Sequence, residues 1–188
     1  MKTYKDKKQY RYKGYDYSRE GFYFVTICTK NREIFFGDVV DSKMVLSKIG
    51  LIAGKYWREI PNHFSFVKLD EFIIMPNHIH GIIQINDNRR NAPRRVPTGI
   101  QPLVKNSLSS IINHFKGNVK RFCNNNDLEF AWQSRFHDRI IRNDDELNRI
   151  RRYIIDNPLK CLPAISLSAS GDWQAGELDR NNLENLLM

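Results

Sequence analysis

The stretch that decides the fold is FIIMPNHIHGIIQI, residues 72–85, in which Pro76–Asn77 separates two apolar runs. Proline and asparagine favour tight turns, so the pattern predicts two strands, over 64–76 and 78–85, joined as a hairpin. Side chains alternate between the two faces of a strand. One face therefore carries His78, His80, Ile82 and Gln84, and the other, which we expect to face the core, carries Ile79, Gly81, Ile83 and Ile85.

The two histidines are unusual in such an apolar strand. Because His78 and His80 are two residues apart, a rigid strand would direct both imidazoles to the same place. Neutral imidazole is a good ligand for divalent metals. Histidine pairs of this kind are also satisfied by ordinary hydrogen bonds, and the pair alone leaves both interpretations open.

The other elements follow from apolar periodicity and capping residues. We expect strands at 22–29 and 131–142, a helix over 46–60 and another over 107–123 that begins at Ser107. Asn143 is expected to cap a last helix that starts at Asp144, with Glu146 in a capping-box position and Pro158 as its end. This order predicts an α+β fold, a ferredoxin-like βαββαβ antiparallel sheet with an additional C-terminal helix.

Composition points to a polyanionic partner. The chain has 30 Lys and Arg residues against 21 Asp and Glu, a net charge of +9 and a pI near 9.5. Such a balance favours nucleic acid. No apolar run approaches the roughly 18 residues of a membrane span, and the start of the chain lacks the apolar core of a signal peptide. With Cys28, Cys123 and Cys161 far apart, the sequence predicts a cytoplasmic protein with reduced thiols, without membrane contact.

Charge also divides the chain. Residues 1–19 form a basic, tyrosine-rich arm, either simply solvated or in contact with a nucleic acid backbone. We expect one domain over 20–158 and a C-terminal tail over 159–188. Within the domain, residues 86–106 predict a long cationic loop.

The last helix adds side chains that fit the histidine pair. Arg149, Tyr153 and Asn157 are spaced i, i+4, i+8, beside an apolar stripe of Leu147, Ile150 and Ile154. Taken singly, Tyr153 reads as a half-buried core tyrosine and Asn157 as a residue that ends a helix. With the histidines, a hydroxyl nucleophile and an amide oxygen resemble parts of one site.

Several motifs now match a known family. MPNHIHGII (75–83), SRFHDRIIRNDDEL (134–147), YIIDNP (153–158) and the earlier DYSREGFYFVTICT (16–29) resemble the insertion-sequence 200-like single-tyrosine transposases. These belong to the histidine–hydrophobic–histidine (HUH) endonucleases. The resemblance runs from about residue 11 to residue 160, and the branch it favours is the REP-associated tyrosine transposases.

The resemblance implies a role for each matching residue. His78 and His80 would bind a divalent ion, Mg²⁺ or Mn²⁺, and Asn157 would complete the metal shell. Tyr153 would attack a phosphate of single-stranded DNA and give a 5′-phosphotyrosine link. The expected partner is single-stranded DNA with REP-like hairpins, and the sequence leaves a homodimer open.

Basic residues are the expected DNA contacts. In the arm, Arg11 and Lys13 fall where the resembled branch reads a tetranucleotide beside its hairpin. The remaining candidates lie on the cationic loop, on the basic flank of the helix over 107–123 and on the last helix, and they are Arg89, Arg90, Arg94, Arg95, Lys116, Lys120 and Arg149.

Two other functions fit the same scaffold. A domesticated protein could bind DNA hairpins without cutting them. An RNA-binding module could use the same sheet, but it would require exposed aromatic residues where this chain has His78 and His80. His137 could supply a third imidazole near the metal, although a structural or DNA-facing role for His137 and Asp138 is favoured.

Overall fold

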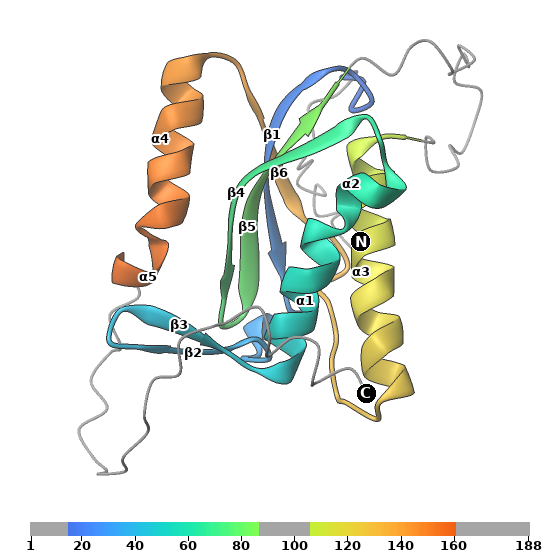
Figure 1. Cartoon of the computed structure of the whole chain (residues 1–188), viewed down its shortest axis with the longest axis vertical. Helices are drawn as coiled ribbons and strands as arrows, with labels where there is room; N and C mark the ends of the chain where they lie inside the picture. Colours follow the sequence, from blue (N-terminus) through green and yellow to red (C-terminus); the bar gives the residue numbers. More distant parts are fainter. Residues whose placement is uncertain (1–14, 87–105, 161–188) are drawn as a thin grey trace, which may run out of the picture.

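A four-stranded antiparallel sheet forms the centre of the protein. In this computed structural model, which describes residues 15–86 and 106–160, the strand order is β4-β5-β1-β6 (Figure 1). The strands are β1 (Gly21–Cys28), β4 (Val67–Met75), β5 (His78–Ile85) and β6 (His137–Ile141). With α1 (Lys48–Arg58) after β1 and α3 (Leu108–Asn125) after β5, the order confirms the predicted ferredoxin-like topology.

The helices form a layer on each side of the sheet. Figure 1 shows α1 and α3 on one side and α4 (Asp144–Ile155) on the other. The sheet is therefore covered on both faces, and α4 occupies the face that the prediction left for the additional helix or a ligand.

The main core lies between the sheet and the helices α1 and α3. It takes Ile79, Ile83 and Ile85 from β5, as the alternation predicted, together with alternate residues of β1. Gly81 belongs to the same face, and the indole of fully buried Trp57 lies against it: a Cβ at position 81 would be 2.3 Å from Cζ2 of Trp57. Glycine is therefore required here for packing.

A second, smaller core lies beneath α4. Its buried members are the predicted stripe of Leu147, Ile150 and Ile154, packed on Ile82 and Ile141 of the sheet. Both faces of β5 are thus buried, which explains why the strand is apolar almost throughout.

Capping residues set the beginnings of the helices. Ser47 and Ser107 accept hydrogen bonds from the backbone amides of Gly50 and Ser110, and α1 and α3 start just after them. Asn143 caps α4 as predicted, accepting from the amide of Glu146 at 2.8 Å. Glu146, however, accepts from the amide of Arg142 rather than from that of its capping partner.

The structure differs from the prediction in three places. The strand expected over 131–142 is confined to β6, because the chain before it is held by other bonds, among them an isolated bridge between Thr29 and Trp132. A hairpin of β2 (Gly37–Val40) and β3 (Lys43–Leu46) lies where the sequence predicted no strand. Asp41 and Ser42 connect it, with φ of 47° and 60°, the left-handed values that a two-residue hairpin loop uses.

The third difference is at the end of α4. That helix stops at Ile155, before Pro158, which lies in a separate short helix, α5 (Asn157–Lys160). The remaining short helices are η1 (Lys30–Arg32) and α2 (Ile60–His63). Between residues 15 and 86 and between 106 and 160, no helix has the length and apolar character needed to span a bilayer.

Candidate active site

The histidine pair is at the start of β5, with its two rings directed to one point. Nε2 of His78 lies 3.1 Å from Nε2 of His80. His80 is buried, with 6% of its surface exposed. Its ring lies beside that of His78, and the two ring centroids are 4.5 Å apart. The side-chain alternation along β5 therefore brings both imidazoles together, as expected.

Two polar residues orient these rings, and the sequence did not single out either of them. Asn77 Oδ1 lies 2.7 Å from Nδ1 of His78. A carbonyl oxygen only accepts, so Nδ1 carries the proton and Nε2 keeps its lone pair. On the neighbouring strand, Thr26 Oγ1 lies 2.9 Å from Nδ1 of His80, whose cross-strand partner it is. Such partners hold the ring of a metal-binding histidine in one orientation.

Burial keeps the pair neutral. Desolvation, with a smaller contribution from the charge of Arg32, lowers the pKa of His78 to about 4. Desolvation, followed by the effect of His78, lowers the pKa of His80 to about 3. Both imidazoles are therefore uncharged at neutral pH, the form in which they can bind a cation.

Tyr153 on α4 lies beside the pair. Its hydroxyl is 3.3 Å from Nε2 of His80, and its side chain remains 40% exposed. Phe24 packs on both, stacked on the His80 ring at 5.3 Å and edge-on to the Tyr153 ring at 6.1 Å. A phenol that is accessible from outside and held beside two imidazoles fits a nucleophile better than a core tyrosine.

The donor set can be tested against a cation. Two nitrogens bound to one ion at about 2.1 Å, at an angle near 90–110°, are roughly 3.0–3.4 Å apart, and the observed 3.1 Å lies in that range. No third His, Cys, Asp or Glu joins the pair within 15–86 or 106–160. The side chains present thus fit a cation with two imidazole ligands and open positions.

Asn157, the predicted third ligand, lies just beyond the helix that carries Tyr153. It is the first residue of α5 rather than a continuation of the α4 stripe, and it is 8% exposed. Asp156, the C-cap of α4, keeps right-handed helical backbone angles between the two helices. The role of Asn157 in the metal shell stays a prediction.

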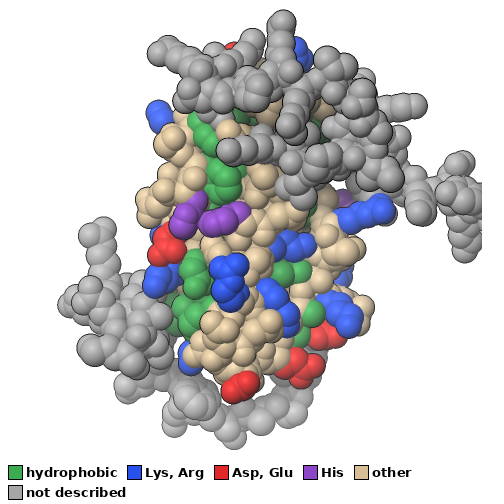
Figure 2. Space-filling model, turned by 90° about the vertical axis from the view of Figure 1, so that its right-hand side faces the viewer, with side chains coloured by type: hydrophobic (Ala, Val, Ile, Leu, Met, Phe, Trp, Pro, Cys, Tyr) green, Lys and Arg blue, Asp and Glu red, His purple; other side chains and the backbone are tan. Residues whose placement is uncertain are grey.

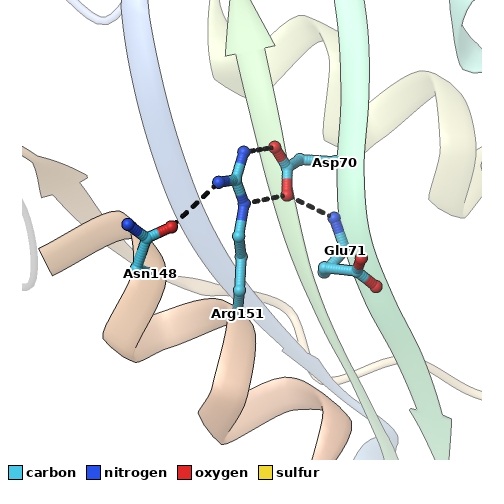
Figure 3. A network of polar contacts seen from close by, with 4 residues as sticks. All are labelled: Asp70, Glu71, Asn148 and Arg151. Carbon is cyan, nitrogen blue, oxygen red and sulfur yellow. Dashed lines mark hydrogen bonds and ion pairs between the residues drawn. The ribbon is translucent and has the colours of Figure 1, made fainter. Parts of the chain in front are cut away.

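An ion pair fastens α4 to the edge of the sheet (Figure 3). Arg151 donates from Nε and Nη2 to the two carboxylate oxygens of Asp70 on β4, at 2.8 and 2.6 Å. Asn148 accepts from Nη1 of the same guanidinium at 3.0 Å. The pair joins residues 81 positions apart, and no local pattern in the sequence indicates it.

The predicted DNA contacts have differing surroundings. Lys and Arg side chains gather over the lower part of the face shown in Figure 2, the side of the molecule that carries α3. On α3, Lys116 donates to the carbonyl of Gln133 at 2.6 Å and Lys120 to that of Phe130 at 2.7 Å, so both lysines also hold the chain before β6. Arg149 is exposed on α4. The remaining candidates, Arg11, Lys13, Arg89, Arg90, Arg94 and Arg95, lie outside the described residues.

The other histidines lie apart from the pair. His137 is exposed on β6, where it is in register with Thr26 and therefore two strands from His80. Two strand spacings amount to about 10 Å, which favours the structural or DNA-facing interpretation over a third ligand. His63 and His114, which carried no motif, lie together on α2 and α3 with ring centroids 4.5 Å apart.

Comparison with known proteins finds a named transposase among the chain's relatives. It is 36% identical over 159 residues to an uncharacterized protein of Haemophilus influenzae, covering 81% of this chain and 88% of the relative. It is 25% identical over 145 residues to a putative REP-associated tyrosine transposase of the same organism, covering 77% and 74%. No family model matches the sequence.

A solved structure agrees in fold. A REP-associated tyrosine transposase bound to a REP hairpin matches with a TM-score of 0.57 at 19% identity, covering 80% of this chain and 73% of that one. A putative transposase from Deinococcus radiodurans gives a TM-score of 0.43, too low to support an argument. The motifs, the named relative and the shared fold agree: the chain is a relative of the REP-associated tyrosine transposases and has their fold.

Proposed function

We propose that this protein cuts and rejoins single-stranded DNA beside hairpins, with Tyr153 as nucleophile and His78 and His80 as metal ligands. The observation that carries the proposal is the convergence of three groups: the Nε2 atoms of the two histidines 3.1 Å apart and the Tyr153 hydroxyl 3.3 Å from His80. The relationship to a putative REP-associated tyrosine transposase supports it, as does the hairpin bound to the structural relative.

The chemistry requires help for the phenol. A tyrosine hydroxyl has an ordinary pKa near 10 and is a weak nucleophile at neutral pH. A divalent cation held by His78 and His80 would polarise the phosphate oxygens and stabilise the charge that develops on them. Of the two ions expected, Mn²⁺ is the more compatible with imidazole, because Mg²⁺ strongly prefers oxygen ligands.

The reaction is a transesterification. The Tyr153 oxygen forms a bond to phosphorus, the bond from phosphorus to the 3′ oxygen breaks, and the phenol proton goes to water. The leaving oxygen takes up a proton from water and becomes a 3′-hydroxyl. Because the number of phosphate ester bonds is unchanged, another 3′-hydroxyl can reverse the step, which permits rejoining to a different strand.

A labelled DNA hairpin with single-stranded flanks tests the proposal. With Mn²⁺ or Mg²⁺, DNA labelled at its 3′ end should become attached to the protein and survive denaturation. The same DNA labelled at its 5′ end should be released as a shorter fragment. Tyr153→Phe should abolish the adduct and retain hairpin binding, whereas the matched variant Tyr56→Phe, on α1, should form it normally.

Each other outcome has a definite meaning. If the parent protein binds hairpins tightly but forms no adduct with any hairpin from its source genome, the domesticated, non-cutting binder is the correct function. An adduct that persists in Tyr153→Phe would show that another residue is the nucleophile. Tighter binding to an RNA strand than to the DNA hairpin would instead support the RNA-binding module.

A further inference from the structure

We infer that the ion pair of Asp70 and Arg151 is a positioning device: it fixes the rotation of α4 about its axis and so places the Tyr153 hydroxyl beside the histidine pair. This inference rests on the proposed role of Tyr153 as nucleophile. Neither residue touches the reacting groups, so both are positioning residues.

The geometry of α4 places Arg151 and Tyr153 on opposite flanks of the helix, so a contact at Arg151 affects the position of Tyr153. Arg151 and Tyr153 are two residues apart, which corresponds to about 200° around a helix with 3.6 residues per turn. The stripe of Leu147, Ile150 and Ile154 packs on the sheet between them. Arg151 therefore reaches toward β4 on one flank of α4, and Tyr153 reaches toward His80 on the other.

The carboxylate is itself held in place by an irregularity of β4. Between Leu69 and Phe72 the register shifts, so that Asp70 and Glu71 both lie opposite Ile82 of β5. This is a β-bulge, a device that redirects a side chain out of the regular alternation. The amide of Glu71 donates to Asp70 Oδ1 at 2.8 Å. This bond helps to hold the carboxylate in the orientation in which it contacts Arg151 (Figure 3).

The apolar stripe alone would not define this rotation. Apolar contacts stabilise a helix on a sheet but are non-directional, whereas a two-pronged contact from arginine to carboxylate has a fixed geometry. Another tie of α4 is at its first turn, where Glu146 accepts from the amide of Arg142 and pairs with Arg139 at 2.6 Å. Tyr153 is two turns further on, so the contact at Arg151 is the nearer constraint.

Misplacement of the nucleophile gives the expected size of the effect. A displacement of about 1 Å in a reacting group can lower a rate roughly 100-fold. Asp70→Asn keeps the size of the side chain and removes the charge-assisted contact. We expect it to slow single-turnover adduct formation at saturating DNA by roughly 10- to 100-fold. Affinities for the DNA hairpin and for Mn²⁺ should remain near those of the parent protein.

Matched variants separate positioning from general effects. Glu71→Gln removes the neighbouring carboxylate from the same bulge and should react at the parent rate. The exchange Asp70→Arg with Arg151→Glu restores an ion pair of reversed polarity and should recover much of the lost rate. Parent-like reaction of Asp70→Asn, or an equal loss in Glu71→Gln, would overturn the inference.

Two further measurements keep the test decisive. If Asp70→Asn is poorly folded, Arg151→Lys decides, because it keeps the charge and loses the two-pronged contact: a reduced rate supports the inference and a parent rate contradicts it. If the parent forms no adduct, the proposed function fails, and amide hydrogen exchange judges the ion pair alone. Faster exchange of the second half of α4 in Asp70→Asn than in Glu71→Gln supports it, and equal exchange refutes it.

Discussion

His78 and His80 remain uncharged because water is largely excluded from their rings, and this couples the site to folding. In the unfolded chain both imidazoles would be protonated near their ordinary pKa of about 6.5. In the folded protein the pKa is about 4 for His78 and about 3 for His80. Below pH 6.5 the unfolded state therefore binds more protons, and stability falls as the pH falls.

The first prediction follows from that sign. Between pH 6.5 and pH 4, the free energy of unfolding should rise with pH, with a slope of up to roughly 1.4 kcal/mol per pH unit for each histidine. Urea denaturation at a series of pH values measures it in protein freed of metal. His80→Gln should have a shallower slope than the parent, and an unchanged slope would show that His80 titrates normally.

A second prediction concerns the residues that orient the rings. Removing the partner of a metal-binding histidine typically weakens the metal site about 10- to 100-fold. Asn77→Ala, which loses the 2.7 Å contact to His78, and Thr26→Val, which loses the 2.9 Å contact to His80, should both bind Mn²⁺ more weakly in calorimetric titrations. His114→Ala removes an imidazole elsewhere on the molecule and should bind Mn²⁺ as the parent does.

At the scale of the element, β5 depends on the small size of Gly81 as much as on its histidines. A methyl group at this position would lie 2.3 Å from the ring of Trp57, which is fully buried. Gly117 on α3 is a natural control, because a Cβ there would have no atom within 4 Å.

The third prediction compares these two glycines. Gly81→Ala overpacks the core and should lower the free energy of unfolding by about 1–3 kcal/mol. Gly117→Ala, at an exposed helical position, should raise it by roughly 0.5–1 kcal/mol. Thermal or urea denaturation of the two variants checks both signs, and a neutral Gly81→Ala would mean that the indole can move aside.

The sequence predicted the elements whose patterns are local. The alternation over 78–85 placed the histidines and the isoleucines correctly, and the spacing of Leu147, Ile150 and Ile154 found the face of α4 that packs down. The predicted caps Ser107 and Asn143 located the starts of two helices. Each of these signals depends on residues within about two turns of one another.

The features that were missed depend on distant or subtle interactions. The contact between Asp70 and Arg151 joins two elements through a bulge, and the Thr26 contact with His80 depends on strand register. The β2–β3 hairpin was missed because Asp41–Ser42 is a weaker turn signal than Asn-Gly or Asp-Gly. The end of α4 was misjudged because Pro158 is compatible with the first turn of a new helix.

At the scale of the whole molecule, the net charge of +9 dominates encounters with DNA. A fourth prediction is that hairpin affinity falls steeply as salt rises, because each neutralised phosphate of a single strand contributes roughly 0.7 to the slope of log affinity against log salt. Fluorescence anisotropy measures that slope at salt concentrations from roughly 50 to 200 mM, where the effect on affinity is large. Tyr153→Phe should have the same slope as the parent. An affinity that does not change with salt would exclude an interface dominated by contacts to phosphates.

Among residues 15–86 and 106–160, β4 is an outer strand of the sheet and pairs with β5 on one side only. An outer strand offers unpaired backbone groups on which a second chain can pair, and natural proteins interrupt such edges with bulges and charges. The irregularity at Asp70 and Glu71, flanked by Lys68, meets that description. The final prediction is that deleting Glu71 straightens the edge and makes the protein self-associate in gel filtration, whereas Glu71→Gln stays in the state of the parent. The bend that aims a carboxylate at α4 would then also keep the protein from aggregating.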